Sequence, residues 1–141
     1  MALERNERIP RALPIVFWIL IAAFVVLAAS ILSEPFLELI GPAFLPLMGL
    51  CFALGLALLV LSVRWRASSL LRTLWIVTGA APMGLAVGSV LHNVFYAVEM
   101  VTDAQPLLKG TVQVLGGAFF VFGVLICPVA FVGSAAGAII V

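Results

Sequence analysis

The residues best suited to chemistry lie close together in the second half of the chain. His92 is the only histidine and Tyr96 the only tyrosine, and Asn93, Glu99 and Asp103 are near them in sequence. In an α-helix, positions 92, 96, 99 and 103 fall within about 60° of one another around the axis. Four of these side chains would therefore form one polar stripe, with Asn93 beside it.

Such a cluster serves either hydrogen bonding between helices or a chemical function. We favour the structural interpretation, in which His92 and Asn93 bond to backbone near Gly116 and Gly117 while Tyr96 lies in an interfacial aromatic belt. Contact with a partner, a lipid or a quinone-type head group is the alternative. A metal or haem site has less support, because a single histidine with scattered carboxylates falls short of recognised ligand clusters. We expect no metal and no cofactor.

The two cysteines offer no further chemistry. Cys51 and Cys127 each stand alone inside an apolar run, without a C-x-x-C pair. A thiol in apolar surroundings is inert, so we interpret both as packing residues. The chain also lacks a phosphate loop, an H-E-x-x-H pair and a G-x-S-x-G elbow. We therefore expect it not to be an enzyme.

The composition identifies the elements that must position these residues. Hydrophobic residues make up 65 % of the chain and charged residues 9 %, against roughly half and a quarter in soluble domains. Uncharged runs cover residues 12–33, 39–63, 73–98 and 110–141. A membrane crossing needs about 20 apolar residues, so each run is long enough for one helix. We predict an all-α integral membrane four-helix bundle forming a single domain over 1–141, with helices at about 12–32, 43–63, 70–97 and 110–136.

The basic residues predict the orientation of this bundle. Six of the seven fall at the N-terminus or in and just after the second connection, whereas the first and third connections carry acidic residues and one lysine. These six are Arg5, Arg8, Arg11, Arg64, Arg66 and Arg72. Because basic loops stay cytoplasmic, we predict that both termini are inside (N-in, C-in). The first apolar run exceeds the length of a signal-peptide core, so we expect it to be retained. We expect the protein to lie in a bacterial or archaeal cytoplasmic membrane.

Small residues predict how the helices associate, because lipid provides no hydrophobic force between them. The third helix carries Gly84 and Gly88 at small-xxx-small spacing, on the same face as the polar stripe. A hairpin folded about residues 104–105 brings residue 88 level with 121 and residue 92 level with 117. The fourth helix carries the matching small residues, which include Gly116, Gly117 and Gly123. Pro82 and Pro128 fall at one depth of this hairpin, and we expect matched kinks there in two long helices.

Three classes of function are compatible with these features. The first is a structural, accessory or assembly subunit, which acts by association with other membrane subunits or with itself. The second is a small channel or transporter formed by an oligomer, supported by the polar stripe and the prolines. The third is a redox protein that uses His92. No Asp, Glu, Lys or Arg lies in the interior of a predicted helix, where proton-coupled carriers need an ionisable relay, which disfavours that kind of transport. The net charge of +1 disfavours nucleic-acid binding.

Overall fold

The computed structural model describes residues 11–65, 69–101 and 106–141, and nearly all of these residues are helical. The prediction of an all-α chain with four helical stretches long and apolar enough to cross a membrane is confirmed. The elements are α1 (Ala12–Leu32), α2 (Glu34–Ile40), η2 (Gly41–Ala43), α3 (Phe44–Arg64), α4 (Ser69–Val101), α5 (Pro106–Phe120), the π-helical turn η3 (Val121–Ile126) and α6 (Cys127–Ile140).

The first connection differs from the loop that the sequence suggests. Residues 34–40 form the short helix α2, and the 3-10 turn η2 joins it to α3. Pro35 lies in the first turn of α2 and Pro42 in η2, where a missing N–H removes no helical hydrogen bond. Prolines that bracket a segment therefore start new helical turns here.

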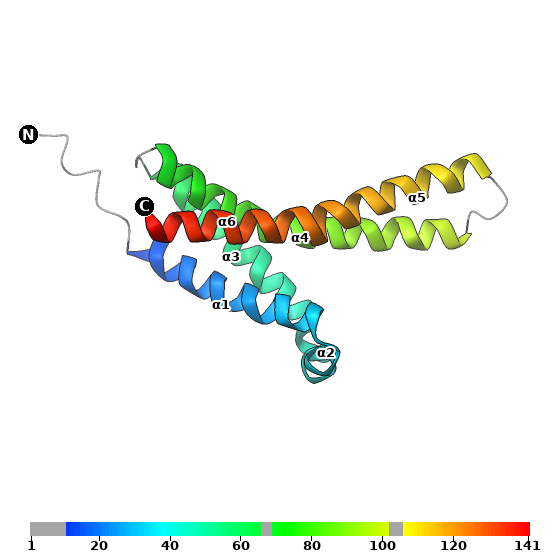
Figure 1. The fold of residues 1–141 in the computed structure, drawn as a ribbon, viewed down its shortest axis with the longest axis horizontal. Helices are drawn as coiled ribbons and strands as arrows, with labels where there is room; N and C mark the ends of the chain where they lie inside the picture. The colour runs from blue at the N-terminus through cyan, green and yellow to red at the C-terminus, as the bar shows by residue number, and fades with distance from the viewer. Residues whose placement is uncertain (1–10, 66–68, 102–105) are drawn as a thin grey trace, which may run out of the picture.

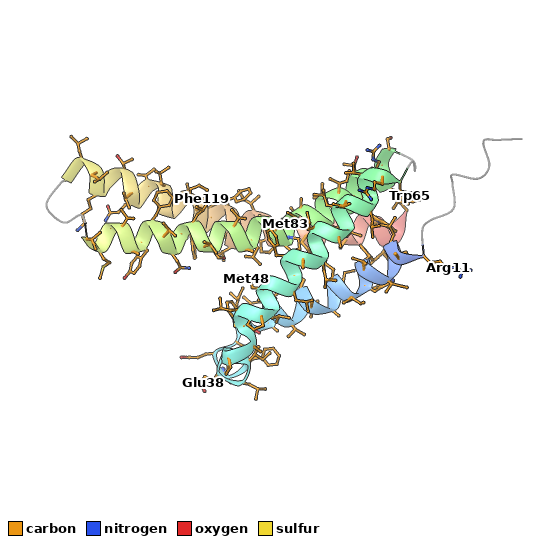
Figure 2. The ribbon with its side chains drawn as sticks, turned by 180° about the vertical axis from the view of Figure 1, so that it is seen from behind. Arg11, Glu38, Met48, Trp65, Met83 and Phe119 are labelled. Carbon is orange, nitrogen blue, oxygen red and sulfur yellow. The ribbon has the colours of Figure 1, made fainter. Side chains whose placement is uncertain are left out.

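The helices form two hairpins that share one end and diverge at the other, which gives the molecule a V shape (Figure 1). One hairpin consists of α1 and α3, and the other of α4 with α5, η3 and α6. Figure 2 places Arg11 and Trp65 at the shared end, and Glu38 at the free end of the α1–α3 hairpin. The outer half of α4 and all of α5 extend away from the other helices, so the four stretches pack as a bundle only near the shared end.

Aromatic side chains fill the core at the shared end. Trp75 of α4 stacks on Phe17 of α1 with 5.7 Å between ring centroids. The ring of Trp65 also packs against Trp75, with 5.4 Å between centroids. Farther in, Phe24 of α1 stacks on Phe131 of α6 at 3.9 Å. These contacts connect α1 to α4 and to α6, the two helical arms of the second hairpin, and all five rings are almost completely buried.

Pro128 is the second residue after the π-helical turn, which ends at Ile126. A proline in a helix lacks its N–H, and its ring clashes with the carbonyl four residues earlier, which is that of Val124. Val124 lies within residues 121–126, where the helix widens to the π form. The wider turn gives room for the ring, and such insertions commonly accompany bends in a helix. Pro82, by contrast, is buried within a segment of α4 that stays α-helical from Ser69 to Val101.

Candidate functional site

Four polar side chains meet in the cleft between the outer half of α4 and α5. His92, Tyr96 and Glu99 come from α4, as the helical spacing predicts, and Gln113 comes from α5. Together with Val112, Gly116 and Gly117 they line a pocket of about 210 Å³. Asp103, the last member of the predicted stripe, lies outside the described residues.

His92 is tied to the facing helix by a hydrogen bond. Its Nδ1 lies 2.9 Å from the carbonyl oxygen of Gly116. A carbonyl only accepts, so Nδ1 carries the proton and donates it. The ring also packs against Phe120, with 5.1 Å between centroids. The absence of a side chain at Gly116 relieves a tight contact with Phe95, which a Cβ there would approach to 3.3 Å, whereas Nδ1 of His92 would be at an ordinary contact distance of 3.9 Å.

Glu99 and Gln113 form the second polar link across the cleft. The amide Nε2 of Gln113 donates to Oε1 of Glu99 over 2.6 Å, at an exposed position. Sequence reasoning did not single out Gln113. It lies one helical turn before Gly116 and Gly117, so the hairpin register could have placed it beside the polar stripe.

Asn93 faces a different part of the molecule. Its Nδ2 donates a hydrogen bond of 2.8 Å to the carbonyl oxygen of Ser89 in its own helix, and the side chain is exposed. Both residues border a groove of about 390 Å³ between the start of α3 and the outer half of α4. We call this groove the notch; its lining is Phe44, Leu45, Met48, Ser89, Val90, Asn93, Val94 and Ala97.

The predicted glycines differ in how closely they approach the facing helix. A Cβ on Gly88 would lie 2.8 Å from Cα of Gly123, and one on Gly84 would lie 2.6 Å from Sγ of Cys127. Observed partners are thus within two residues of the expected hairpin register. Gly117 differs from the expectation: nothing lies within 4 Å of its Cβ position. Gly117 borders the pocket, where the space beside it is open, whereas a Cβ on its neighbour Gly116 would lie 3.3 Å from Phe95.

Two further close contacts lie nearer the shared end, and sequence reasoning missed both. Gly55 of α3 and Gly79 of α4 allow their backbones to touch, since a Cβ on Gly55 would lie 2.5 Å from the Gly79 oxygen. Thr78 of α4 and Ser134 of α6 bring their hydroxyl oxygens within 2.9 Å, and both side chains are buried. Gly79 has no small residue four positions before or after it, the spacing that signals close helix packing. Gly55 has only Cys51 at that spacing.

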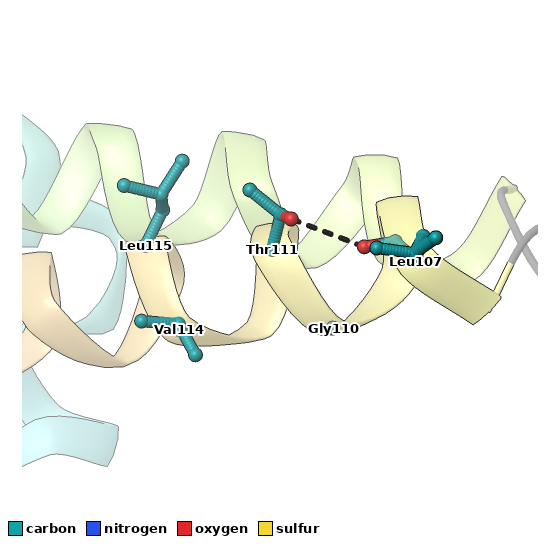
Figure 3. Close-up of a pocket in the computed structure, with 5 residues that line it drawn as sticks. All are labelled: Leu107, Gly110, Thr111, Val114 and Leu115. Atoms are coloured by element: carbon teal, nitrogen blue, oxygen red, sulfur yellow. Dashed lines mark hydrogen bonds between the residues drawn. The ribbon is translucent and has the colours of Figure 1, made fainter.

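The outward face of α5 carries a shallow apolar hollow of about 610 Å³ (Figure 3). Leu107, Gly110, Thr111, Val114 and Leu115 line it. The Thr111 hydroxyl donates 3.0 Å to the carbonyl of Leu107, within the same helix, so the hollow offers little free hydrogen-bonding capacity (Figure 3). This face is suited to apolar contact rather than to chemistry.

The part of the chain that the structure describes contains no group of three or more His, Cys, Asp or Glu side chains able to hold a metal ion. Cys51 and Cys127 are buried on different helices as free thiols. Comparison with models of protein families, with curated proteins and with solved structures finds no match. The function must therefore be inferred from the chain's own geometry.

Proposed function

We propose that this chain is a non-catalytic integral membrane protein that acts through helix–helix association, as an accessory or assembly subunit of a membrane complex. The notch between the two hairpins is the observation that supports this proposal. It is an elongated, mostly apolar groove whose two walls, α3 and the outer half of α4, diverge from a common base. A transmembrane helix of another subunit laid in the notch would contact both hairpins at once.

The polar residues of the notch would orient a partner helix bound there. Helices in lipid associate through close packing and through hydrogen bonds, each worth about 1 kcal/mol. Asn93 uses its Nδ2 on the backbone of its own helix, and its amide oxygen can accept from a partner. The hydroxyl of Ser89 lies one helical turn away on the same wall. A hydroxyl or amide on the partner helix would meet this pair.

Photocrosslinking within native membranes tests the proposal. A photoreactive residue at Val90, which lines the notch and is 52 % exposed, should form an adduct with one specific protein. The matched control is Val25 on α1, which is 60 % exposed and lies outside the notch. Lipid adducts alone at Val90, or the same adducts at both positions, would contradict the proposal. An adduct of twice the chain's mass would favour self-association.

The proposal includes an N-in, C-in orientation in a prokaryotic cytoplasmic membrane. Arg11 lies at the shared end of the V, where α3 ends at Arg64 and the first turn of α4 carries Arg72. Glu34 and Glu38 lie on α2 at the free end. A reporter that works only in the cytoplasm should be active after Val141 and inactive near Asp103, because basic residues are retained inside. Activity near Asp103 alone would reverse the orientation.

An oligomeric channel or transporter is the second candidate. The buried hydroxyl pair of Thr78 and Ser134 favours it, because this pair places polar groups within the apolar part of the second hairpin. No charged residue lies between Arg72 and Glu99, so an ion path along α4 would depend on hydroxyls alone. Ion flux through vesicles containing the purified protein, abolished by Thr78→Val, would favour this candidate over an accessory subunit.

A further inference from the structure

We propose that the notch receives a second copy of this chain, so that α4 of one copy packs along α4 of the other in a symmetric dimer. This inference rests on the proposed function, because it names the partner of the same groove. The contact surface is a row of four exposed residues on the outer half of α4, which we call the seam: Val90, Asn93, Ala97 and Met100. The first three also line the notch.

The spacing of the seam is typical of a helix that packs along another helix. Its residues lie three, four and three positions apart, which keeps them on one face of α4 over about three turns. Two of them are large and apolar, yet Val90 is 52 % and Met100 66 % exposed. In Figure 1 this part of α4 extends away from α3, and Met48, labelled in Figure 2, belongs to the opposite wall of the notch. Exposure of apolar residues is ordinary for a helix in lipid, so the polar residues must identify the partner.

The hydroxyl of Ser89 lines the notch and keeps its hydrogen-bonding capacity for a partner. Most hydroxyls within the helices donate to a carbonyl three or four residues earlier in the chain. This pattern holds for Ser30, Ser62, Thr73, Thr78, Thr111 and Ser134. The Ser89 hydroxyl makes no hydrogen bond to any residue that the structure describes. Because lipid supplies no water to satisfy polar groups, a bound helix has to provide the missing partner.

The amide of Asn93 is its own complement. One of its Nδ2 hydrogens is donated to the carbonyl of Ser89, and the amide keeps a second N–H donor and an oxygen with two acceptor positions. Two such amides that face each other form two reciprocal hydrogen bonds, with each Nδ2 donating to the other Oδ1. The second acceptor position of each Oδ1 is then available to the Ser89 hydroxyl of the opposite copy. A single Asn in an otherwise apolar seam is a recognised means of fixing helix register and number.

A second copy provides this match more simply than an unrelated helix does. All copies insert in the same orientation, because each carries the same distribution of basic residues. A two-fold axis along the membrane normal therefore places each seam residue level with its counterpart, and one surface serves both sides of the contact. The V shape accommodates the dimer, because the outer half of α4 with α5 from each copy enters the notch of the other (Figure 1). There it also covers Leu45, which is 70 % exposed on the α3 wall.

Disulfide formation between cysteines introduced into the seam tests this contact in native membranes. In Val90→Cys and Ala97→Cys, the two-fold axis brings equal positions within the short Cβ–Cβ distance that a disulfide needs, so mild oxidation should give a species of twice the chain's mass. The matched control is Val87→Cys, which is 48 % exposed on the same helix but about 100° around its axis from the centre of the seam. It should stay monomeric, as should the parent chain, whose Cys51 and Cys127 are buried. Absence of the dimer in both seam variants, or an equal yield in the control, would overturn the proposal.

Energy transfer between donor- and acceptor-labelled full chains in vesicles tests the role of the amide. Asn93→Ala removes the reciprocal hydrogen bonds and should raise the apparent Kd of the dimer at least about fivefold, the effect of losing one interhelical hydrogen bond in lipid. Asn93→Gln keeps an amide and should recover most of the affinity. Thr111→Val is the control, because that hydroxyl bonds within α5, and it should leave the Kd unchanged. An unchanged Kd in Asn93→Ala would overturn the proposal.

Photocrosslinking at Val90 separates failure of this inference from failure of the proposed function. An adduct with one different protein would leave the proposed association intact and overturn the second copy as its partner. An adduct of twice the chain's mass would support both, whereas lipid adducts alone would contradict both.

Discussion

The contact between α3 and α4 should be sensitive to a single methyl group at Gly55. A Cβ at this position would lie 2.5 Å from the carbonyl oxygen of Gly79, whereas ordinary van der Waals contact begins near 3.4 Å. The obstacle is backbone, so it cannot move aside as a side chain would. Gly55→Ala must therefore push the two helices apart by about 0.9 Å. A gap of 0.5–1 Å forfeits roughly a quarter to a half of the dispersion energy of the atoms concerned.

The loss can be separated from the effect of alanine on the helix itself. Alanine improves helix propensity over glycine by about 1 kcal/mol, and it does so equally at Gly49 of the same helix. Gly49 has nothing within 4 Å of its Cβ position. Relative to Gly49→Ala, we expect Gly55→Ala to lower the free energy of unfolding by about 2–3 kcal/mol, the usual cost of overpacking a tight contact.

Unfolding in mixed micelles, followed by tryptophan fluorescence, measures this difference. Trp65 and Trp75 lie 5.4 Å apart at the shared end of α3 and α4, so their emission reports whether the two helices remain in contact. Equal stability of Gly55→Ala and Gly49→Ala would refute the reasoning. A double variant with Gly79→Ala adds a further test: its loss should be smaller than the sum of the two single losses, because the helices are already separated.

Three pairs of variants test the second hairpin by thermal unfolding. His92→Gln should be largely tolerated, whereas His92→Leu should cost about 1–3 kcal/mol by removing the donor to a partly buried carbonyl; equal losses would contradict this. Gly88→Leu should loosen or misfold the protein, since its Cβ would contact backbone at 2.8 Å, whereas Gly117→Leu, with open space beside it, should melt like the parent. Thr78→Val should cost about 1 kcal/mol more than Thr73→Val, because both hydroxyls bond the carbonyl four residues back but only Thr78 also meets a buried hydroxyl. Equal costs would show that this contact adds nothing.

The helices could be predicted from the positions of the charges, because lipid requires long uncharged runs. The predicted first helix at 12–32 matches α1, and the others differ by a few residues at their ends. The predicted fourth helix at 110–136 is a longer stretch that changes helical form at residues 121–126. The change follows from Pro128, whose effect on the preceding turn cannot be derived from hydrophobicity. The divergence of the hairpins also depends on tertiary contacts, which single-sequence patterns do not specify.

The site was predictable where residues share one helix and less so where two helices meet. The spacing of His92, Tyr96 and Glu99 is sufficient to place them on one face of α4, and they line one pocket. Gln113 belongs to another helix and enters the pocket only through the register of the hairpin. Gly55 shows the same limit, because its role depends on Gly79, which lies opposite it on another helix.

Close glycine packing also positions the candidate site itself. Gly88 lies one helical turn before His92 on α4, and it meets Gly123 within the π-helical turn that joins α5 to α6. The close approach there brings the C-terminal part of α5 near enough for Nδ1 of His92 to reach the Gly116 carbonyl. That hydrogen bond in turn ties the polar residues of α4 to the backbone of α5. Enlarging Gly88 should therefore disturb the pocket even where the protein still folds, because the pocket depends on the distance between two backbones rather than on its polar residues alone.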